Sequence, residues 1–252
     1  MTNSNNSLKI KNLSKTYHTP QGETLAIKDI SFDVEDNAFI AIVGSSGCGK
    51  STLLSILAGL IDKSGGEINY KKQNPKFGYM LQQDALFPWL TILDNACLGL
   101  DIQKNKTLEN IGYVKNLLHT YKLTEFIDKK PAALSGGMRQ RVALIRTLAT
   151  KPDILFLDEP FSALDYQTRL AVSDDVYNII KAQNLPTIMI THDIAEAISM
   201  ADKIIVLSAR PATIKNIYDI NLTDKSTPIN NRKAKEFATY YEKIWKDLDI
   251  NV

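Results

Sequence analysis

The segment that most constrains this fold is glycine-rich and reads Gly44-Ser45-Ser46-Gly47-Cys48-Gly49-Lys50-Ser51. It matches the pattern G-x-x-x-x-G-K-[ST] at every defined position. A continuous apolar run at 39–43 precedes it, and a helix-forming segment that starts with Thr52 follows it. Such a run is typical of a strand buried on both faces. The sequence therefore predicts a buried strand, a phosphate-binding loop and a helix in succession.

The residue types in this loop suit the phosphates of a nucleotide. Glycines let the backbone turn so that its N–H groups point at an anion, and a helix N-terminus adds partial positive charge. Lys50 would contact the β- and γ-phosphates, and the Ser51 hydroxyl would bind Mg²⁺. We expect every residue from Gly44 to Thr52 to line the nucleotide site. Cys48 occupies a free position of the motif, where a small loop residue is a simpler explanation than a redox role.

Three later apolar runs resemble the strand before the loop. They lie at 154–157, 187–190 and 204–207, with helical stretches before or between them. Buried strands separated by helices are typical of a parallel α/β sheet. Nearer the start, Leu8 and Ile10 alternate with lysines, and 30–34 alternates in the same way. A turn-prone stretch at 19–22 separates these two segments, so the sequence predicts an antiparallel sheet there.

The region 90–150 contains no comparable run and shows helical spacing instead, so we expect a mostly helical insertion. A last amphipathic helix is predicted within 220–252 from the spacing of Phe237, Tyr241, Ile244 and Leu248. We expect this helix to pack on the surface of its own domain. The interpretation is one domain over 8–252, with a frayed tail at 1–7.

Composition excludes several classes of protein. The net charge is +2, which does not describe a general nucleic-acid binder. The chain has two cysteines, too few for a disulfide framework, which favours a reducing compartment. Apolar runs stay shorter than the ~18 residues of a membrane span, and the N-terminus lacks the apolar core of a signal peptide. We expect a cytosolic location, with any work at a membrane done through a partner that spans it.

Two acids follow the buried run at 154–157. Asp158 would reach the carboxyl edge of the sheet, where ligands bind in open α/β folds, and is placed to bind Mg²⁺. Glu159 would face the γ-phosphate and polarise a water molecule. Two adjacent carboxylates at a buried strand end repel each other unless a cation lies between them. Next to a phosphate-binding loop, this pair predicts hydrolysis rather than a merely solvated strand end.

A second candidate anion site begins at Ser135, within Leu134-Ser135-Gly136-Gly137-Met138-Arg139-Gln140-Arg141. Ser135 can cap a helix, and Gly136 and Gly137 expose backbone N–H groups. One nucleotide does not need two cradles in one chain, whereas a head-to-tail dimer does. A guanine-specific Asn-Lys-x-Asp motif is not matched, because 105–108 reads Asn-Lys-Thr-Leu.

At this point the sequence resembles the ATP-binding cassette (ABC) ATPases, from about Leu8 to Pro211. The segment 134–140 resembles the family's signature, and 162–165 resembles its D-loop at the dimer interface. The resemblance implies a P-loop NTPase fold of the α/β class, with a mainly parallel core sheet, an N-terminal antiparallel subdomain and a helical subdomain. It also implies a homodimer that binds and hydrolyses ATP with Mg²⁺, with Lys50 and Glu159 among the catalytic residues.

The same resemblance assigns roles to three further residues. Gln82 is similar to the Q-loop glutamine that contacts Mg²⁺ and communicates with the membrane partner, and Gln83 is a weaker candidate for that position. His192 resembles the switch histidine at the γ-phosphate. Tyr17 resembles the aromatic residue that stacks on adenine. Taken alone, each of these side chains would be interpreted as a structural or surface residue without a role in function.

Two finer segments resemble nitrate, sulfonate and taurine importers, whose relatives carry thiamine precursors. These segments are 86–90 and 206–211. The resemblance implies that Phe87, Pro88 and Trp89 contact a permease at the cytoplasmic face of the membrane, with a solute-binding protein acting indirectly. Packing inside the helical subdomain is the alternative for the two aromatics. The sequence departs from the usual pattern of the family at 131–133, Ile145, Thr147 and Ala212, which leaves the substrate subgroup open.

Three other functions remain open from the sequence alone. A soluble, non-transport ABC ATPase is the main alternative, although such proteins usually carry two cassettes or a long coiled coil. A regulatory cassette with negligible turnover is disfavoured by the presence of Glu159 and His192. An exporter subunit is disfavoured by the importer-like segments.

Overall fold

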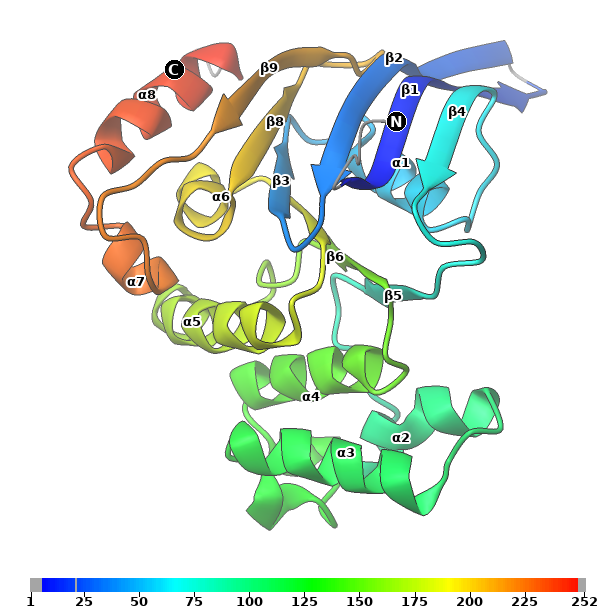
Figure 1. Ribbon diagram of the computed structural model, residues 1–252, viewed down its shortest axis with the longest axis vertical. Coiled ribbons are helices and arrows are strands. Elements are labelled where there is room, and N and C mark those ends of the chain that lie inside the picture. Colours follow the sequence, from blue (N-terminus) through cyan, green and yellow to red (C-terminus); the bar gives the residue numbers. More distant parts are fainter. Residues whose placement is uncertain (1–5, 21, 249–252) are drawn as a thin grey trace.

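The computed structural model describes residues 6–20 and 22–248, in which strands and helices form layers around a central sheet (Figure 1). The strands are β1 (Asn6–Thr19), β2 (Gly22–Glu35), β3 (Phe39–Val43), β4 (Gly65–Tyr70), β5 (Phe77–Met80), β6 (Ile154–Asp158), β7 (Thr187–Thr191), β8 (Lys203–Leu207) and β9 (Ile214–Asp219). The α-helices are α1 (Lys50–Leu57), α2 (Ile92–Ile102), α3 (Leu108–Thr120), α4 (Gly136–Leu148), α5 (Tyr166–Gln183), α6 (Ile194–Met200), α7 (Pro228–Asn231) and α8 (Phe237–Asp247). Two short 3₁₀ helices are η1 (Thr124–Phe126) and η2 (Pro131–Ala133).

The central sheet has the strand order β5-β6-β7-β3-β8-β9. Every neighbouring pair is parallel except β8 and β9, which are antiparallel. The four apolar runs of the sequence thus become the adjacent strands β6, β7, β3 and β8. Strand β3 lies between β7 and β8, which follow it in the sequence, so connections leave β3 and β8 toward opposite edges of the sheet, and the glycine-rich loop follows β3 directly. Ligands bind at such switch points in open α/β sheets, at the carboxyl ends of the strands.

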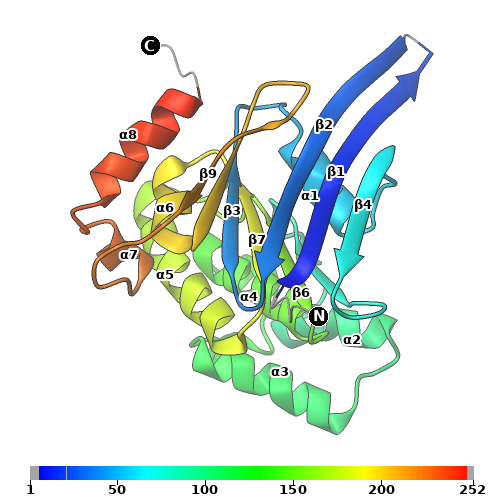
Figure 2. The same ribbon diagram turned by 45° about the horizontal axis from the view of Figure 1, so that its top comes forward.

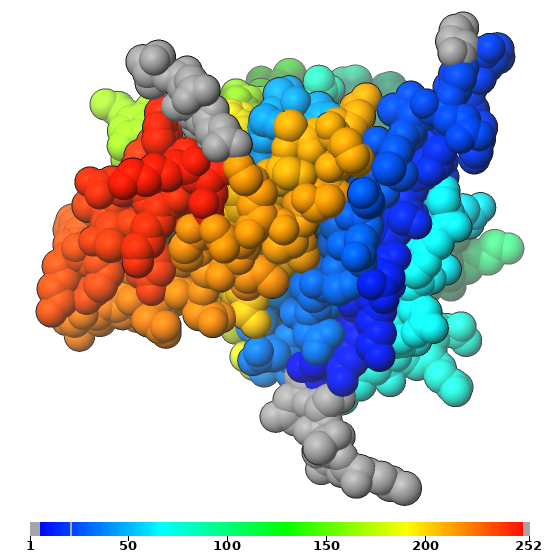
Figure 3. Space-filling view, turned by 90° about the horizontal axis from the view of Figure 1, so that it is seen from above, coloured from blue at the N-terminus to red at the C-terminus, as the bar shows by residue number. Residues whose placement is uncertain are grey.

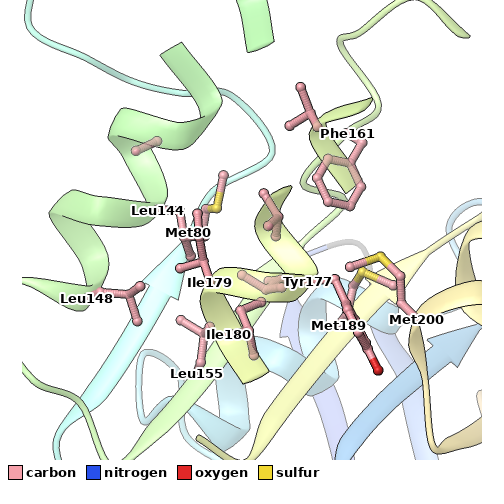
Figure 4. Packing of buried hydrophobic residues seen from close by; sticks show 14 of the residues in the cluster. Met80, Leu144, Leu148, Leu155, Phe161, Tyr177, Ile179, Ile180, Met189 and Met200 are labelled. Atoms are coloured by element: carbon pink, nitrogen blue, oxygen red, sulfur yellow. The ribbon is translucent and has the colours of Figure 1, made fainter. Parts of the chain in front are cut away.

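The continuous apolar runs exist because helices or strands cover both faces of this sheet. In β3, Phe39, Ala41 and Val43 belong to one hydrophobic core, while Ile40 and Ile42 belong to the other. Side chains alternate across a strand, so a strand covered on both sides needs apolar residues at every position. One of these cores packs α4 and α5 against β5 and β6, where Leu144 and Leu148 lie near Met80 (Figure 4).

The N-terminal strands form a separate antiparallel sheet with the order β2-β1-β4, as expected from the alternating pattern (Figure 2). The predicted frayed tail is wrong for Asn6 and Ser7, which belong to β1. The Asn6 amide donates to Asp33 at 2.7 Å, and the Ser7 hydroxyl donates to Asp36 at 2.5 Å. The rest of that predicted tail, residues 1–5, lies outside the described residues, as does Gln21 of the predicted turn.

Between residues 90 and 150, the described structure is helical. Figure 1 shows α2, α3 and α4 gathered at one end of the molecule, away from the N-terminal strands. A side-chain oxygen caps each of these helices at its N-terminus: the residues are Thr91, Thr107 and Ser135. Within the predicted helical stripe, Val114 and Leu118 are buried, whereas Leu108 is 90% exposed because it is the first residue of α3.

Strands β4, β5 and β9 were not predicted from the sequence. Each is short, and β4 begins with two glycines, which weaken any strand pattern. Strand β9 alternates only weakly, because it is an edge strand whose residues are half-buried or exposed. Pairing with a neighbouring strand stabilises each of them: the partners of β4 and β5 are distant in the sequence, whereas β9 pairs with β8, which directly precedes it.

The C-terminal segment runs along β9 and ends in α8. Figure 3 shows β9 and α8 side by side on one face, with the N-terminal strands on the other side of β9. Ile244 is fully buried, while Phe237, Tyr241 and Leu248 are half-buried against the same core. The helix therefore packs on its own domain. Residues 249–252 of the predicted extension lie outside the described residues. Within the described residues, no helix is long and apolar enough to cross a membrane.

Candidate functional site

The glycine-rich loop connects β3 to α1, and it holds Lys50 in a defined position. Lys50 is the first residue of α1 and is only 6% exposed. Its Nζ donates to the carbonyl oxygens of Gly44 at 2.9 Å and Ser45 at 3.0 Å. The two carbonyl oxygens give the buried ammonium group hydrogen-bond partners and place it at the mouth of the loop, where it can meet an anion.

Two glycines are required by the shape of this loop. Gly49 has φ of 123°, a conformation that side-chain-bearing residues rarely adopt. A Cβ at Gly44 would lie 2.8 Å from the Cys48 sulfur. Cys48 is itself buried within the loop, in agreement with a packing role.

A pocket of about 230 Å³ lies against the loop and the start of α1. The residues that line it are Ser46, Gly47, Gly49, Lys50, Ser51, Thr52, Glu159 and Arg210. It thus brings most of the predicted phosphate-binding residues together with one of the predicted catalytic carboxylates. Larger hollows occur elsewhere, but the one with the glycine-rich loop has the chemistry that fits phosphate.

Asp158 lies at the end of β6, held by two hydroxyl groups. Ser51 donates to its Oδ1 at 3.3 Å, and Tyr79 donates to its Oδ2 at 3.0 Å. Burial raises the pKa of Asp158, and repulsion from Glu159 adds to this, while the two hydrogen bonds act in the opposite direction. Burial also raises the pKa of Tyr79 to about 12, so its hydroxyl remains a donor to the carboxylate.

Glu159 follows in a left-handed backbone conformation, with φ of 45°. Such a conformation is costly for a residue with a side chain and is held here by the N–H of Glu159, which donates to Ile190 of β7 at 3.0 Å. His192 Nδ1 lies 3.2 Å from Glu159 Oε2, and the Gln82 amide lies 3.4 Å from the same oxygen.

Gln82 and Ser162 complete a small hydrogen-bonded group around Glu159. The Gln82 amide donates to the Ser162 hydroxyl at 3.2 Å, and this hydroxyl donates to the Glu159 carbonyl at 3.1 Å. The loop after β5, the loop after β6 and the loop after β7 therefore meet at one carboxylate. A movement of any one of these loops changes the surroundings of Glu159.

The oxygen ligands near Ser51 fit Mg²⁺ bound with a nucleotide. Among the described residues, no group of three or more His, Cys, Asp or Glu could hold a metal ion. Mg²⁺ commonly needs only one or two protein oxygens, because water and phosphate supply the others. Ser51 and Asp158 are already within 3.3 Å of each other, and Gln82 joins the group through Glu159.

Tyr17 lies on β1, and its hydroxyl is 3.4 Å from the Thr52 hydroxyl on α1. The ring is 37% exposed, and Lys15 Nζ lies 5.0 Å from its centroid. The exposed aromatic face is thus placed near the end of the phosphate-binding loop. An adenine base could stack there.

The second predicted cradle begins α4. The Ser135 hydroxyl accepts from the Met138 N–H at 3.3 Å and so caps the helix. A Cβ at Gly137 would lie 2.6 Å from Val172 on α5, so this glycine permits close packing of the two helices. None of the described residues that line the phosphate pocket belongs to this segment. Within one chain, the two cradles form separate surfaces.

The segment with Phe87 and Trp89 is exposed and locally ordered. The two rings contact each other at a tilt of 34° with their centroids 5.0 Å apart, and Trp89 is 65% exposed. Asn95, which is fully buried on α2, accepts from the Phe87 N–H at 2.7 Å and donates to the Phe87 carbonyl at 3.1 Å. A buried amide thus presents an aromatic pair to the outside.

Sequence reasoning missed several residues of the site. Arg210 lines the phosphate pocket, Tyr79 positions Asp158, and Arg146 donates to the carbonyls of Asp84 and Ala85 at 2.7 Å each. Only Arg210 had a usable signal, since its segment was already singled out at 206–211. The other two act through tertiary contacts between distant segments.

Comparison with known proteins identifies the family. Residues 27–162 match the family model described as "ABC transporter". The chain is 44% identical over 248 residues to an uncharacterised ABC transporter ATP-binding protein of Bacillus subtilis, covering 96% of this chain and 95% of the relative. It is 37% identical to a nitrate import ATP-binding protein of Synechocystis, covering 94% and 93% of the two chains.

Solved structures agree with this assignment. A dimeric bacterial ABC transporter cassette has a TM-score of 0.72 and 29% identity, covering 85% of this chain and 99% of that one. The same cassette was also solved in a dimeric post-hydrolysis state bound to ADP and Pi, with a TM-score of 0.71. The sequence prediction of an α/β P-loop fold is confirmed. This chain belongs to the ABC transporter family and is an ATP-binding, ATP-hydrolysing member of it.

Proposed function

We propose that two copies of this chain bind two ATP–Mg²⁺ complexes across a head-to-tail interface. The observation that carries this proposal is the separation of two anion-binding features. Lys50 and Glu159 line one pocket, whereas the Ser135 helix N-terminus lies on another surface of the same chain. Each nucleotide would lie between the first feature of one copy and Ser135, Gly136 and Gly137 of the other.

In this proposal Glu159 polarises the attacking water, and His192 orients the Glu159 carboxylate and senses the γ-phosphate. The 3.2 Å contact between the two side chains supports this pairing. Lys50 and the backbone N–H groups of the loop stabilise charge on the phosphates as it builds up. Mg²⁺, when bound with ATP at Ser51, Asp158 and Gln82, neutralises charge on the β- and γ-phosphates. Tyr17 stacks on adenine.

We further propose that ATP hydrolysis energises import of a small solute through a partner permease. The protein would act at the cytoplasmic face of the membrane, with no nucleic acid involved. Support comes from the Synechocystis relatives named for nitrate import and bicarbonate transport, the latter 36% identical over 242 residues. A nitrate-, sulfonate- or taurine-like anion is the preferred solute, and a thiamine-precursor-like compound is the other candidate. A solute-binding protein would deliver it to the permease.

The aromatic pair at Phe87 and Trp89, with Pro88 between them, is the proposed contact with the permease. Large aromatic side chains on an ordered surface make strong interface anchors. Exchange of both rings for alanine should release the permease while ATP hydrolysis by the isolated protein persists. Exchange of Tyr166, which is equally exposed at 65%, is the matched control and should leave the complex intact.

The experiment that tests the proposal is affinity purification of the tagged protein from its own detergent-solubilised membranes. We expect a multi-span permease and a solute-binding protein to copurify with the wild type. Loss of the permease with the Phe87→Ala, Trp89→Ala variant would locate the contact. Ribosomal or DNA-repair partners without a membrane protein would instead establish a soluble, non-transport ABC ATPase.

A further inference from the structure

The phosphate pocket contains a cation that does not belong to the glycine-rich motif. Of the described residues that line this pocket, Lys50 and Arg210 carry a positive charge. Arg210 comes from the loop between β8 and β9, more than 150 residues away in sequence. Its Nη2 donates to the Gly47 carbonyl at 2.8 Å, so the guanidinium lies directly beside the phosphate-binding loop.

The loop that carries Arg210 is held in place on both sides. Ser208 donates its hydroxyl to the Ala209 and Pro211 carbonyls at 2.9 and 3.2 Å, and accepts from the Thr213 N–H at 2.9 Å. Ala212 is fully buried. Its N–H donates to Ala26 on β2 at 2.9 Å, and its carbonyl accepts from the Lys28 N–H at 2.9 Å. Arg210 therefore projects from a positioned turn, although its own side chain is exposed.

With a nucleotide bound, the negative charge in the pocket would exceed the positive charge that Lys50 and Mg²⁺ supply. A triphosphate carries several negative charges, and Glu159 and Asp158 add two carboxylates close by. Lys50 and one Mg²⁺ offset only part of this charge. A guanidinium is always protonated and has five N–H donors in a planar fork that suits phosphate oxygens. One of these donors reaches Gly47, which leaves others for an anion in the pocket.

We propose that Arg210 is a further nucleotide-binding residue, whose guanidinium contacts the β- and γ-phosphates while it holds the Gly47 carbonyl. This inference rests on the proposed function, because it requires ATP in the pocket at Lys50. It adds a ligand from the β8–β9 loop to those supplied by the glycine-rich loop.

The test compares the affinities of the full-length protein for ATP, ADP and AMP by isothermal titration calorimetry, for wild type, Arg210→Gln and Arg210→Lys. We expect Arg210→Gln to weaken ATP and ADP binding by about tenfold, the value of one charge-assisted contact, and AMP binding by less than about twofold. Arg210→Lys keeps the positive charge but lacks the planar guanidinium, so its affinity for ATP and ADP should lie between those of wild type and Arg210→Gln. Lys28→Gln is the matched control, since its backbone holds the same loop but its side chain does not line the pocket.

Two results would overturn the inference. Equal losses for ATP, ADP and AMP would show that Arg210 only shapes the loop through Gly47. Unchanged ATP affinity, with or without a change in dimerisation, would remove Arg210 from the phosphate site. Thermal unfolding of each variant without nucleotide identifies a folding defect. If Arg210→Gln has such a defect, the affinities of Arg210→Lys for ATP, ADP and AMP decide the test. Failure of wild type to bind ATP would instead refute the proposed function.

Discussion

Asp158 and Glu159 are neighbours in the sequence but occupy different surroundings. Asp158 ends a strand and is held by Ser51 and Tyr79, next to the loop that would bring Mg²⁺. Glu159 has a left-handed conformation and contacts His192. Two carboxylates that are adjacent in the chain therefore have different partners, as the proposed roles of a metal-binding acid and a water-activating acid require.

The first prediction concerns Glu159. Glu159→Gln removes the base but retains the shape of the side chain, so we expect ATP binding to persist and turnover to fall by about 100-fold or more. Phosphate release and ATP binding should be measured on the same preparation. Glu109→Gln, an exposed acid at the start of α3, is the control and should have no effect. Unchanged turnover in Glu159→Gln would remove this residue from the mechanism.

A second prediction concerns Glu196, a buried acid on α6. Burial, followed by repulsion from Asp193, raises its pKa to about 8 from 4.5, although Thr191 donates to it at 3.2 Å and Arg169 and Arg232 lie near. The folded state holds this proton more tightly than the unfolded chain does. The contribution of Glu196 to the free energy of unfolding is therefore fully present below about pH 4.5. This contribution is then lost as the pH rises towards about 8.

Glu196→Gln should remove this contribution, because the amide stays neutral and can still accept from Thr191. We expect urea unfolding midpoints of the variant to depend less on pH between about 4.5 and about 8 than those of wild type. Other acids titrate in both proteins, so the difference between the two curves is the quantity to compare. Glu242→Gln, on the exposed side of α8, should reproduce the wild-type curve. Identical slopes for Glu196→Gln and wild type would contradict the prediction.

At the scale of elements, α4 connects the two surfaces of the site. Its first turn presents Ser135 and Gly136, and its later turns carry Arg139 and Arg146. Arg139 donates to the Asp84 carboxylate at 2.9 Å, and Arg146 donates to two carbonyls of the same segment. The helix is thereby joined to the chain between Gln82 and Phe87. A shift of α4 at a dimer interface would thus move the exposed aromatic pair.

The third prediction tests the packing of α4 on α5. Gly137→Ala places a Cβ 2.6 Å from Val172 and 3.1 Å from Thr168, so we expect a loss of about 1–3 kcal/mol in the free energy of unfolding. Gly112→Ala on α3 is the matched control, since a Cβ there meets nothing within 4 Å. It should gain up to about 1 kcal/mol from helix propensity. Urea denaturation measures both, and changes of the same sign would contradict this account.

At the scale of the whole molecule, the described chain carries two candidate anion-binding features that do not meet within it. Segments that follow β3, β6 and β8 of the central sheet hold the phosphate pocket, while the helical region holds the Ser135 cradle. Figure 1 shows these two regions at different ends of the molecule. In the proposed head-to-tail dimer, a second copy would join these features, and ATP between them would hold the copies together.

The fourth prediction follows from this arrangement. In a Glu159→Gln background, ATP should convert the protein to a dimer, as measured by sedimentation velocity. Lys50→Ala and Ser135→Arg should each abolish this dimer. A mixture of the two variants should form the dimer again, because each mixed dimer has one intact site built from the normal Lys50 and the normal Ser135. No dimer in the mixture would argue against the head-to-tail arrangement.

The sequence alone determined the local features of this protein. The buried strands around 39–43, 154–157, 187–190 and 204–207, the phosphate-binding loop and the two acids follow from short motifs and continuous apolar runs. These signals are local because a loop that turns around phosphate, or a strand covered on both faces, constrains every residue within it. The family resemblance then allowed Gln82, His192 and Tyr17 to be named.

Tertiary structure decided what depends on contacts between distant segments. The edge strands β4 and β5 exist because partners far along the chain supply their hydrogen bonds, and the edge strand β9 depends on its pairing with β8. Three hydrogen bonds could not be predicted from a local sequence pattern: those from Tyr79 to Asp158, from Arg146 to Asp84 and from Arg210 to Gly47. Each joins residues more than 60 positions apart, and only the packing of sheet and helices brings such residues within hydrogen-bond distance.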